Sequence, residues 1–265
     1  QMLWDDRRFL SRIINVVFDE GHCVSQWKEF REDYEQMGEL RMRIFRNLHV
    51  PFYVASATLP VEVLQDIKHI LHLHPTTKYF LRSTDRPDIQ LHARHLVYPA
   101  GSYQDLDFLI PAGANKENPP PKFVVFIDDT KKCEDVAAYL QSKLGNADDV
   151  QNRITYFHAI LSAVQREKVV RMLQEGDIWG LAASEAFGMG IDVRDLRIAV
   201  QYLATCNLTR LWQRYGRLVR GTDDDGVGIL LYDQRDTIEW REAAIARSVK
   251  KREDEITKTL KKRKA

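Results

Sequence analysis

Residues 13–22 read IINVVFDEGH and join a short apolar run to two adjacent carboxylates. The run is nearly continuous rather than alternating, as in a strand that is buried on both faces of a parallel sheet. Asp19 and Glu20 follow it directly. At the end of a buried strand such a pair suits nucleotide hydrolysis, because one acid can hold Mg²⁺ through water while the other activates the attacking water. A simple surface turn can also begin with an Asp-Glu pair.

Short apolar runs of this kind alternate along the chain with segments of helical period. We expect strands at residues 13–18, 52–55, 123–127, 154–157, 178–183, 198–202 and 227–232. Helical spacing of apolar residues occurs at 63–71 and 136–144, and Asn207 is a candidate N-cap for a further helix. This alternation of strand and helix predicts an open α/β sheet.

The composition is that of an ordinary globular chain. Of 265 residues, 44% are hydrophobic and 29% are charged, which argues against a disordered or rod-like protein. No apolar run approaches the roughly 18 residues of a membrane-spanning helix, so we expect no membrane partner. The three cysteines, Cys23, Cys133 and Cys206, form no CxxC pair and therefore predict neither a zinc site nor a disulfide framework.

The net charge of +1 hides a basic C-terminal segment. Residues 247–265 contain nine Lys or Arg against three acids, so the rest of the chain carries a net negative charge. Residues 237–265 read as one long charged helix, which ends in the cluster KKRK at 261–264. Such a cluster is typical of nuclear-localisation signals and phosphate-binding tails, although a solvated basic terminus has the same composition.

A loop expected after the acid pair mixes aromatic and cationic side chains. Its Trp27, Phe30 and Arg31 are suited to stacking on bases and contacting phosphates. The same aromatics could instead anchor the loop in the core. Ser56 and Thr58 end the next strand, where hydroxyl groups either relay hydrogen bonds between two sites or form an ordinary ST turn.

Two stretches of the second half carry the sharpest signals. Residues 187–192 read FGMGID, and their glycines let the backbone approach a ligand closely. Residues 213–220 read QRYGRLVR, in which Arg217 and Arg220 are three apart and would share one face of a helix. Two guanidinium groups so placed can neutralise the charge that develops during phosphoryl transfer. Surface salt bridges are the alternative role for both arginines.

The order and wording of these motifs resemble the RecQ family of superfamily 2 DNA helicases, from about residue 13 to about residue 236. Residues 187–192 match that family's motif V, FGMGID, letter for letter, and residues 213–220 are similar to its motif VI, QExGRAGR. Less specific matches, among them the DEAH box, the aromatic loop and the segment that joins the two lobes, occur at residues 19–22, 25–31, 56–58, 83–89 and 157–166.

The resemblance implies two RecA-like lobes that close on ATP and Mg²⁺ and reopen after hydrolysis. By that resemblance Asp19 would bind Mg²⁺ through water and Glu20 would activate the attacking water. Arg220 would be the arginine finger, and Arg217 and Gln213 would support the triphosphate.

The remaining roles implied by the family fall on two further groups of residues. Gly188 and Asp192 would line the nucleotide cleft. Nucleic-acid contacts are implied for Gln26, Trp27, Phe30, Arg31 and His158.

Several departures from the family pattern limit these roles. No Gly is followed directly by Lys, so the chain has no P-loop, and we expect the chain alone neither to bind ATP tightly nor to unwind DNA. The aromatic loop is one residue short, and the zinc module that usually follows motif VI is absent because no cysteine follows Cys206. Other positions differ in residue type: Gly21 for Ala, Ile160 and Val219 for Gly, and Asp128-Asp129 in the motif IV region.

The sequence therefore predicts an α/β protein with part of a first RecA-like lobe at residues 1–90, one complete second lobe with a parallel sheet at 91–236, and a basic helix at 237–265. The expected function is part of an ATP-dependent 3′→5′ DNA helicase, active in DNA repair and recombination, that works on single-stranded, duplex or branched DNA. Protein partners would bind the basic tail, and the localisation would be nuclear in a eukaryote and cytoplasmic otherwise. The alternative is a degenerate, non-catalytic module that binds nucleic acid or a protein.

Overall fold

The computed structural model describes residues 6–26, 37–45, 50–144, 150, 152–188, 191–221, 224–240 and 242. The chain divides into two compact units, Gln1–Asp85 and Arg86–Ala265. The division falls a few residues ahead of residue 90, the border expected from sequence, because strand β3 (Ile89–His95) pairs with β8 (Gly226–Tyr232). Most of the expected basic helix lies outside the described residues. Within the described ranges, no helix is both long and apolar enough to cross a bilayer.

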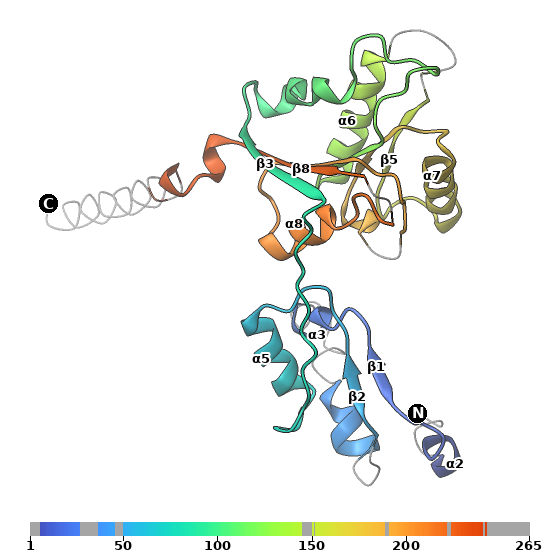
Figure 1. Ribbon diagram of the computed structural model, residues 1–265, viewed down its shortest axis with the longest axis vertical. Coiled ribbons are helices and arrows are strands. Elements are labelled where there is room, and N and C mark those ends of the chain that lie inside the picture. Colours follow the sequence, from blue (N-terminus) through green and yellow to red (C-terminus); the bar gives the residue numbers. More distant parts are fainter. Residues whose placement is uncertain are drawn as a thin grey trace, which may run out of the picture. The chain divides into compact units, whose positions relative to one another are not determined.

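The first unit is built on a small two-stranded sheet (Figure 1). Strand β1 (Val16–Phe18) runs parallel to β2 (Phe52–Val54), so the expected strand from residue 13 begins later than predicted. Phe18 of β1 packs with Val24, Ile67 and Leu71 in one buried cluster. The helical segments of the unit are α2 (Arg7–Leu10), α3 (His22–Gln26), a π-helical turn (Leu40–Ile44) and α5 (Val61–Ile70).

The second unit contains a parallel sheet of six strands in the order β3-β8-β7-β4-β6-β5. The predicted α/β class is therefore confirmed. The strands not yet given are β4 (Phe123–Phe126), β5 (Ile154–Phe157), β6 (Gly180–Ala183) and β7 (Ile198–Tyr202). Among the described residues, helices include α6 (Thr130–Lys143), α7 (Ala163–Glu175) and α8 (Leu208–Tyr215), and short 3₁₀ segments occur at Ala100–Ser102, Gln104–Leu109, Glu185–Phe187 and Gln234–Asp236.

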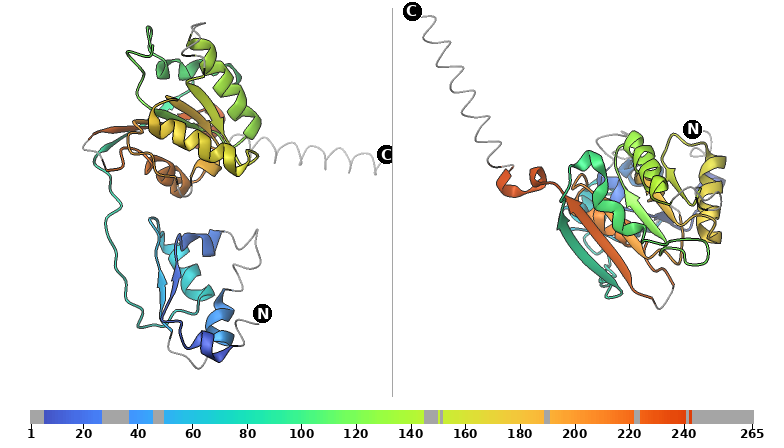
Figure 2. Two further views of the ribbon diagram at one scale, coloured as in Figure 1. Left: turned by 90° about the vertical axis from the view of Figure 1, so that its right-hand side faces the viewer. Right: turned by 90° about the horizontal axis from the view of Figure 1, so that it is seen from above.

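The middle of this sheet is buried on both faces. All four residues of β4 are inaccessible to solvent, as its continuous apolar run predicts. Phe123 and Val125 belong to one buried cluster, which includes residues of α6, whereas Val124 and Phe126 belong to a second cluster that includes residues of α7 and α8. Helix α6 thus covers one face, and α7 and α8 cover the other (Figure 2).

Two elements of the second unit were not predicted. Strand β3 lies at the sheet edge with every residue after Ile89 exposed, so it lacks the apolar signal of a buried strand. Helix α7 begins at a capping box formed by Ser162 and Gln165 and ends at Gly176 in the left-handed conformation. The N-cap predicted at Asn207 is confirmed, because its side chain accepts a hydrogen bond from the backbone N–H of Arg210.

Candidate functional site

The acid pair forms a tight turn directly after β1. Asp19 is exposed, and its Oδ1 accepts the backbone N–H of Glu20 at 2.9 Å. Glu20 has a φ of 49°, a left-handed conformation that costs a residue with a side chain about 1 kcal/mol or more. Backbone strain of this kind persists only where the surrounding structure holds it. The turn thus fixes Glu20 between the end of the strand and the start of α3.

Hydrogen bonds connect this turn to the end of β2. The Nδ1 atom of buried His22 lies 2.8 Å from the hydroxyl of Ser56 and 3.3 Å from Oε2 of Glu20. Ser56 donates its own proton to the carbonyl of Thr58 at 2.9 Å, so His22 is the donor at Nδ1. Burial lowers the pKa of His22 despite the opposing charge of Glu20, which favours the neutral ring. Hydrogen bonds therefore connect the acid-pair motif at residues 19–22 with the motif at residues 56–58, which the sequence analysis identified separately.

Gly21 is required by the close approach of the neighbouring strand. A methyl group at this position would overlap the side chain of Val54 and lie 3.3 Å from the carbonyl oxygen of Ala55. The backbone N–H of Gly21 donates to that same carbonyl at 2.7 Å. The departure from the family's Ala therefore has a local steric cause.

The predicted nucleic-acid loop begins at the end of α3. Gln26 is the last residue of that helix. One residue earlier, the buried Ser25 donates a hydrogen bond to Oδ2 of Asp66 at 2.7 Å, which ties the start of the loop to α5. Outside the described residues lie Trp27, Phe30 and Arg31.

In the second unit, the two predicted arginines lie on a turn and not on a helix. Helix α8 ends at Tyr215, and residues 216–220 form consecutive turns, so the prediction that Arg217 and Arg220 share a helix face was wrong. Within this turn, the φ of 43° at Val219 is also incompatible with a right-handed helix that would reach Arg220. Val219 is nonetheless buried, and its N–H donates to the carbonyl of Leu196 at 2.9 Å.

This turn meets the end of the FGMGID motif. Nη1 of Arg217 donates to the carbonyl of Ile191 at 3.3 Å. Nη1 of Arg220 lies 3.7 Å from Oδ1 of Asp192, and its Nε donates to the carbonyl of Gly216 at 3.0 Å. The fold thus brings together both arginines and Asp192, which are far apart in the sequence. Of the other predicted nucleotide contacts, Gln213 lies on α8, and Gly188 follows the 3₁₀ segment after β6.

His158, a predicted nucleic-acid contact, is buried. Its side chain is 3% exposed, its Nε2 lies 3.1 Å from Oε1 of Glu134, and its ring stacks on Tyr156. A side chain so enclosed offers little surface to a nucleic acid. In this arrangement His158 orients the loop after β5 through its contact with α6.

Arg214, which the sequence did not single out, is the centre of a buried polar cluster. It is 3% exposed and lies over the ring of Phe126, with Cζ 5.2 Å from the centroid. Its Nη1 donates to Oε1 of Gln201, and its Nη2 contacts Asp128 at 2.5 Å and Glu185 at 3.4 Å. One signal in the sequence could have pointed to it: Arg214 stands at the second position of motif VI, where the family pattern QExGRAGR has Glu.

Asp128 has the electrostatics expected of a carboxylate in such a cluster. Burial alone would raise its pKa, but hydrogen bonds from Thr205 and Arg214 outweigh burial and lower the pKa below its usual value. Its side chain remains 33% exposed. The cluster therefore has a buried cation and a partly accessible anion.

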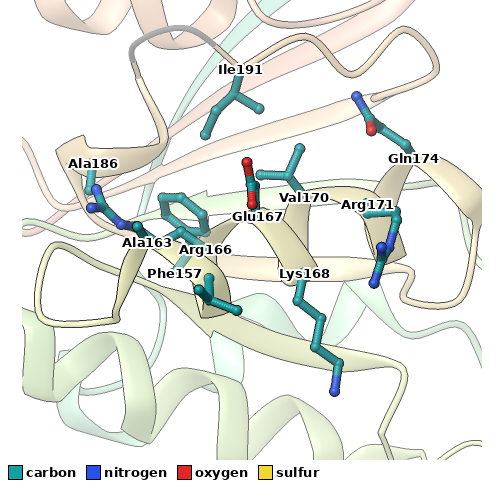
Figure 3. A pocket seen from close by; sticks show the side chains of 11 residues that line it. Phe157, Ala163, Arg166, Glu167, Lys168, Val170, Arg171, Gln174, Ala186 and Ile191 are labelled. Carbon is teal, nitrogen blue, oxygen red and sulfur yellow. The ribbon is translucent and has the colours of Figure 1, made fainter.

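An open pocket of about 780 Å³ lies between α7 and the segment that follows β6 (Figure 3). Its apolar wall includes Phe157 and Ile191. Its lining also includes three cations and one acid, namely Arg166, Lys168, Arg171 and Glu167. The excess of positive charge suits an anionic group, and Arg166 belongs to the motif predicted at residues 157–166.

The donor set at the acid pair fits Mg²⁺. Mg²⁺ prefers oxygen ligands and usually keeps several waters, so one or two carboxylates suffice when phosphates supply the rest. Asp19 presents such a carboxylate at the surface. Among the described residues, no three His, Cys, Asp or Glu side chains gather closely enough to hold a metal ion by themselves.

The chain matches two family models: DEAD/DEAH box helicase over residues 1–67 and Helicase conserved C-terminal domain over residues 102–222. It is 30% identical to the ATP-dependent DNA helicase RecQ of Pasteurella multocida, over 83% of this chain and 32% of that protein. It is 28% identical to the ATP-dependent DNA helicase Q-like 2 of Arabidopsis thaliana, over 79% of this chain and 28% of that protein. The chain spans well under half the length of curated relatives that it matches, from 15% to 38%.

Solved helicase structures share the fold. Dbp5 of S. cerevisiae, bound to RNA and ADP BeF3, aligns with a TM-score of 0.61 and 18% sequence identity, over 86% of this chain and 55% of that chain. The parallel sheet and this structure show the fold of RecA-like lobes, and both matching family models are those of helicases. Within this class, residues 187–192 and 213–220 resemble motifs V and VI of the RecQ family. The relatives named above are DNA helicases of the same type. Over most of its length the chain is similar to DNA helicases of the RecQ type.

Proposed function

We propose that this chain supplies the acid pair and the arginine turn of an ATP-dependent DNA helicase. The observation that carries the proposal is the contact of the turn at residues 216–220 with the end of the FGMGID motif, where Arg217 bonds to Ile191 and Arg220 pairs with Asp192, because a phosphoryl-transfer site needs fixed cations. Asp19 holds Mg²⁺ through water, and Glu20 orients and deprotonates the attacking water. When bound, Mg²⁺ neutralises charge on the triphosphate.

The arginines have separate roles in this proposal. Arg220 is the arginine finger, which stabilises charge in the transition state. Arg217 and Gln213 support the triphosphate, and Gly188 and Asp192 line its cleft. The carbonyl of Ile191 holds Arg217 in place through the hydrogen bond to Nη1. Charge stabilisation by fixed guanidinium groups is worth several orders of magnitude in rate for this reaction class.

The nucleic acid of the proposed reaction is DNA. Relatives named as DNA helicases support this choice. We assign single-stranded DNA to Gln26, Trp27, Phe30 and Arg31, because aromatic and cationic side chains stack on bases and bind phosphates. Translocation is 3′→5′, and duplex or branched DNA is the substrate for unwinding. Salt-dependent binding of single-stranded DNA that weakens in Trp27→Ala supports this assignment, whereas binding that is indifferent to Trp27 contradicts it.

The test of the function is ATP turnover by the full-length gene product. We expect hydrolysis to be stimulated by single-stranded DNA and to be lost in Glu20→Gln, which keeps the size of the side chain but cannot accept a proton. Equal turnover by wild type and Glu20→Gln would contradict the proposal. The isolated 265-residue chain, which contains no P-loop, is expected neither to bind ATP tightly nor to unwind DNA.

A second candidate is a non-catalytic module that binds nucleic acid or a protein. The observation that favours it is the exposed apolar pair Ile160 and Val164, which are 76% and 75% accessible to solvent. Nuclear import and protein binding by the basic tail belong to either candidate. DNA binding without ATP turnover by the full-length gene product would select the second candidate.

A further inference from the structure

Arg214 lies where three strands of the second unit end. Strand β4 ends at Phe126 and is followed by Asp128, β6 is followed by Glu185, and Gln201 of β7 is the register partner of Phe126. Arg214 reaches all three polar groups from helix α8. In open parallel sheets, ligands are bound at this carboxyl edge of the strands.

The contacts of Arg214 require a guanidinium group, because its two terminal nitrogens bind different partners. Nη1 serves the amide oxygen of Gln201, while Nη2 serves the carboxylates of Asp128 and Glu185. Asp128 is held in turn by the hydroxyl of Thr205. A lysine has a single nitrogen and cannot serve both arms with the same geometry.

The next residues of the chain carry the proposed chemistry. Gln213 precedes Arg214 directly, and α8 ends at Tyr215, one residue later. Arg217 and Arg220 lie in the turn that follows. A buried ionic contact at Arg214 therefore fixes the last turn of α8, directly before the turn that contains both arginines.

We propose that Arg214 is a positioning residue, which ties the arginine turn to the strand ends at Asp128 and Gln201 and so keeps Arg217 and Arg220 in their reactive places. This inference rests on the proposed function. It also explains two departures from the family pattern as one feature. The cation in the second position of motif VI and the acid in the motif IV region are partners in the fold.

The test is a double-mutant cycle on ATP turnover by the full-length gene product, with Arg214→Gln, Asp128→Asn and both together. We expect Arg214→Gln to lower kcat about tenfold and to change KM for ATP much less, since misplaced groups act mainly in the transition state. Asp128→Asn should cause a smaller loss. The double variant should lose no more than Arg214→Gln alone, because both changes break one contact.

Two further variants separate positioning from general stability. Arg214→Lys should recover part of kcat, because it keeps the charge. Arg210→Gln is the matched control. Arg210 is on the same helix, with its Nε 3.3 Å from Glu185, and in the described part of the chain it forms no hydrogen bond or ion pair with Asp128 or Gln201. It should stay within about twofold of wild type, as surface pairs contribute little. Thermal unfolding of each variant shows whether it is folded at the assay temperature.

The outcomes distinguish this inference from the proposed function. If wild type turns over ATP no faster than Glu20→Gln, both fail. If wild type is active, the positioning role alone is overturned by any of three results: Arg214→Gln keeps its kcat, the losses in the double variant multiply, or Arg210→Gln is as damaging as Arg214→Gln. Loss of kcat that only follows the unfolded fraction, with no recovery in Arg214→Lys, also overturns it.

Discussion

The two units of the chain differ in how completely their sheets are covered. In the second unit, β4 is inaccessible on both faces and apolar clusters lie on each side of the sheet. In the first unit, Val17 and Tyr53 face each other across β1 and β2 and are 56% and 57% exposed. The second unit thus has a core of its own, while the described residues of the first bury a small cluster around Phe18. The turn at Glu20 is therefore held by local contacts, although the described part of its unit buries few apolar side chains.

The largest expected effect of this difference is on autonomous folding. Residues 86–265 alone should unfold in one cooperative thermal transition, whereas residues 1–85 alone should show none, because a two-stranded sheet with a small core is marginal in water. Circular dichroism melts of the two fragments measure this. A sharp transition from the first fragment would contradict the comparison.

A matched pair of Val→Thr substitutions measures the same difference within one chain. Val125 is inaccessible, so Val125→Thr should cost about 1–3 kcal/mol by burying a hydroxyl without a designed partner. Val17→Thr, on an exposed strand position, should stay within about 0.5 kcal/mol of wild type. Urea denaturation monitored by tryptophan fluorescence gives both values. Equal costs at the two positions would show that β1 is as well covered as β4.

The tight turn of the first unit predicts a further steric effect. Gly21→Ala should destabilise the first unit by about 1–3 kcal/mol, because the new methyl group overlaps Val54. The double variant Gly21→Ala/Val54→Ala should recover part of that loss, although it also removes apolar contacts of Val54. Thermal unfolding of the single and double variants tests this. An undiminished loss in the double variant would place the cause elsewhere.

The smallest expected effects are on pH dependence, and they differ between the units. The pKa of His22 is lowered in the folded state, so the unfolded chain takes up its proton first and stability falls as the pH drops below about 6.5. The pKa of Asp128 is lowered as well, and the stability that it contributes above about pH 4 is lost only as the pH falls further, through its folded value.

Melting curves between pH 7.5 and 3 separate these two windows. His22→Gln should remove only the change that begins near neutrality, and Asp128→Asn only the change in acid. If either substitution abolishes the pH dependence in the other's window, the assignment of the two groups is wrong.

The sequence predicts best what local pattern determines. The buried strands β4, β5 and β7 were placed from continuous apolar runs, and the acid pair was expected at the end of β1. Strand β3 was missed because an exposed edge strand has no such run. The arginine turn was misread as helix because the left-handed backbone at Val219 has no signal in a β-branched residue.

Side-chain contacts between residues that are far apart in the chain could not be predicted from the sequence. Asp128 stood out only as a residue type that differs from the family pattern and Arg214 was not singled out, because their contact depends on how β4 and α8 pack. The hydrogen bonds of His22 to Ser56 and Glu20 similarly depend on the pairing of β1 with β2. In both units, motif positions could be predicted, but partners such as Ser56 and Asp128 come from segments that are far away in the sequence.

The most direct test of the account is whether the acid pair and the arginine turn serve one reaction. The measurement is kcat for DNA-stimulated ATP hydrolysis by the full-length gene product, in wild type, Glu20→Gln, Arg220→Ala and the double variant. We predict losses of about a hundredfold or more in each single variant, and a double variant no slower than the worse single, because residues that act as a unit are not additive. Full activity in Arg220→Ala, or losses that multiply in the double variant, would contradict the account.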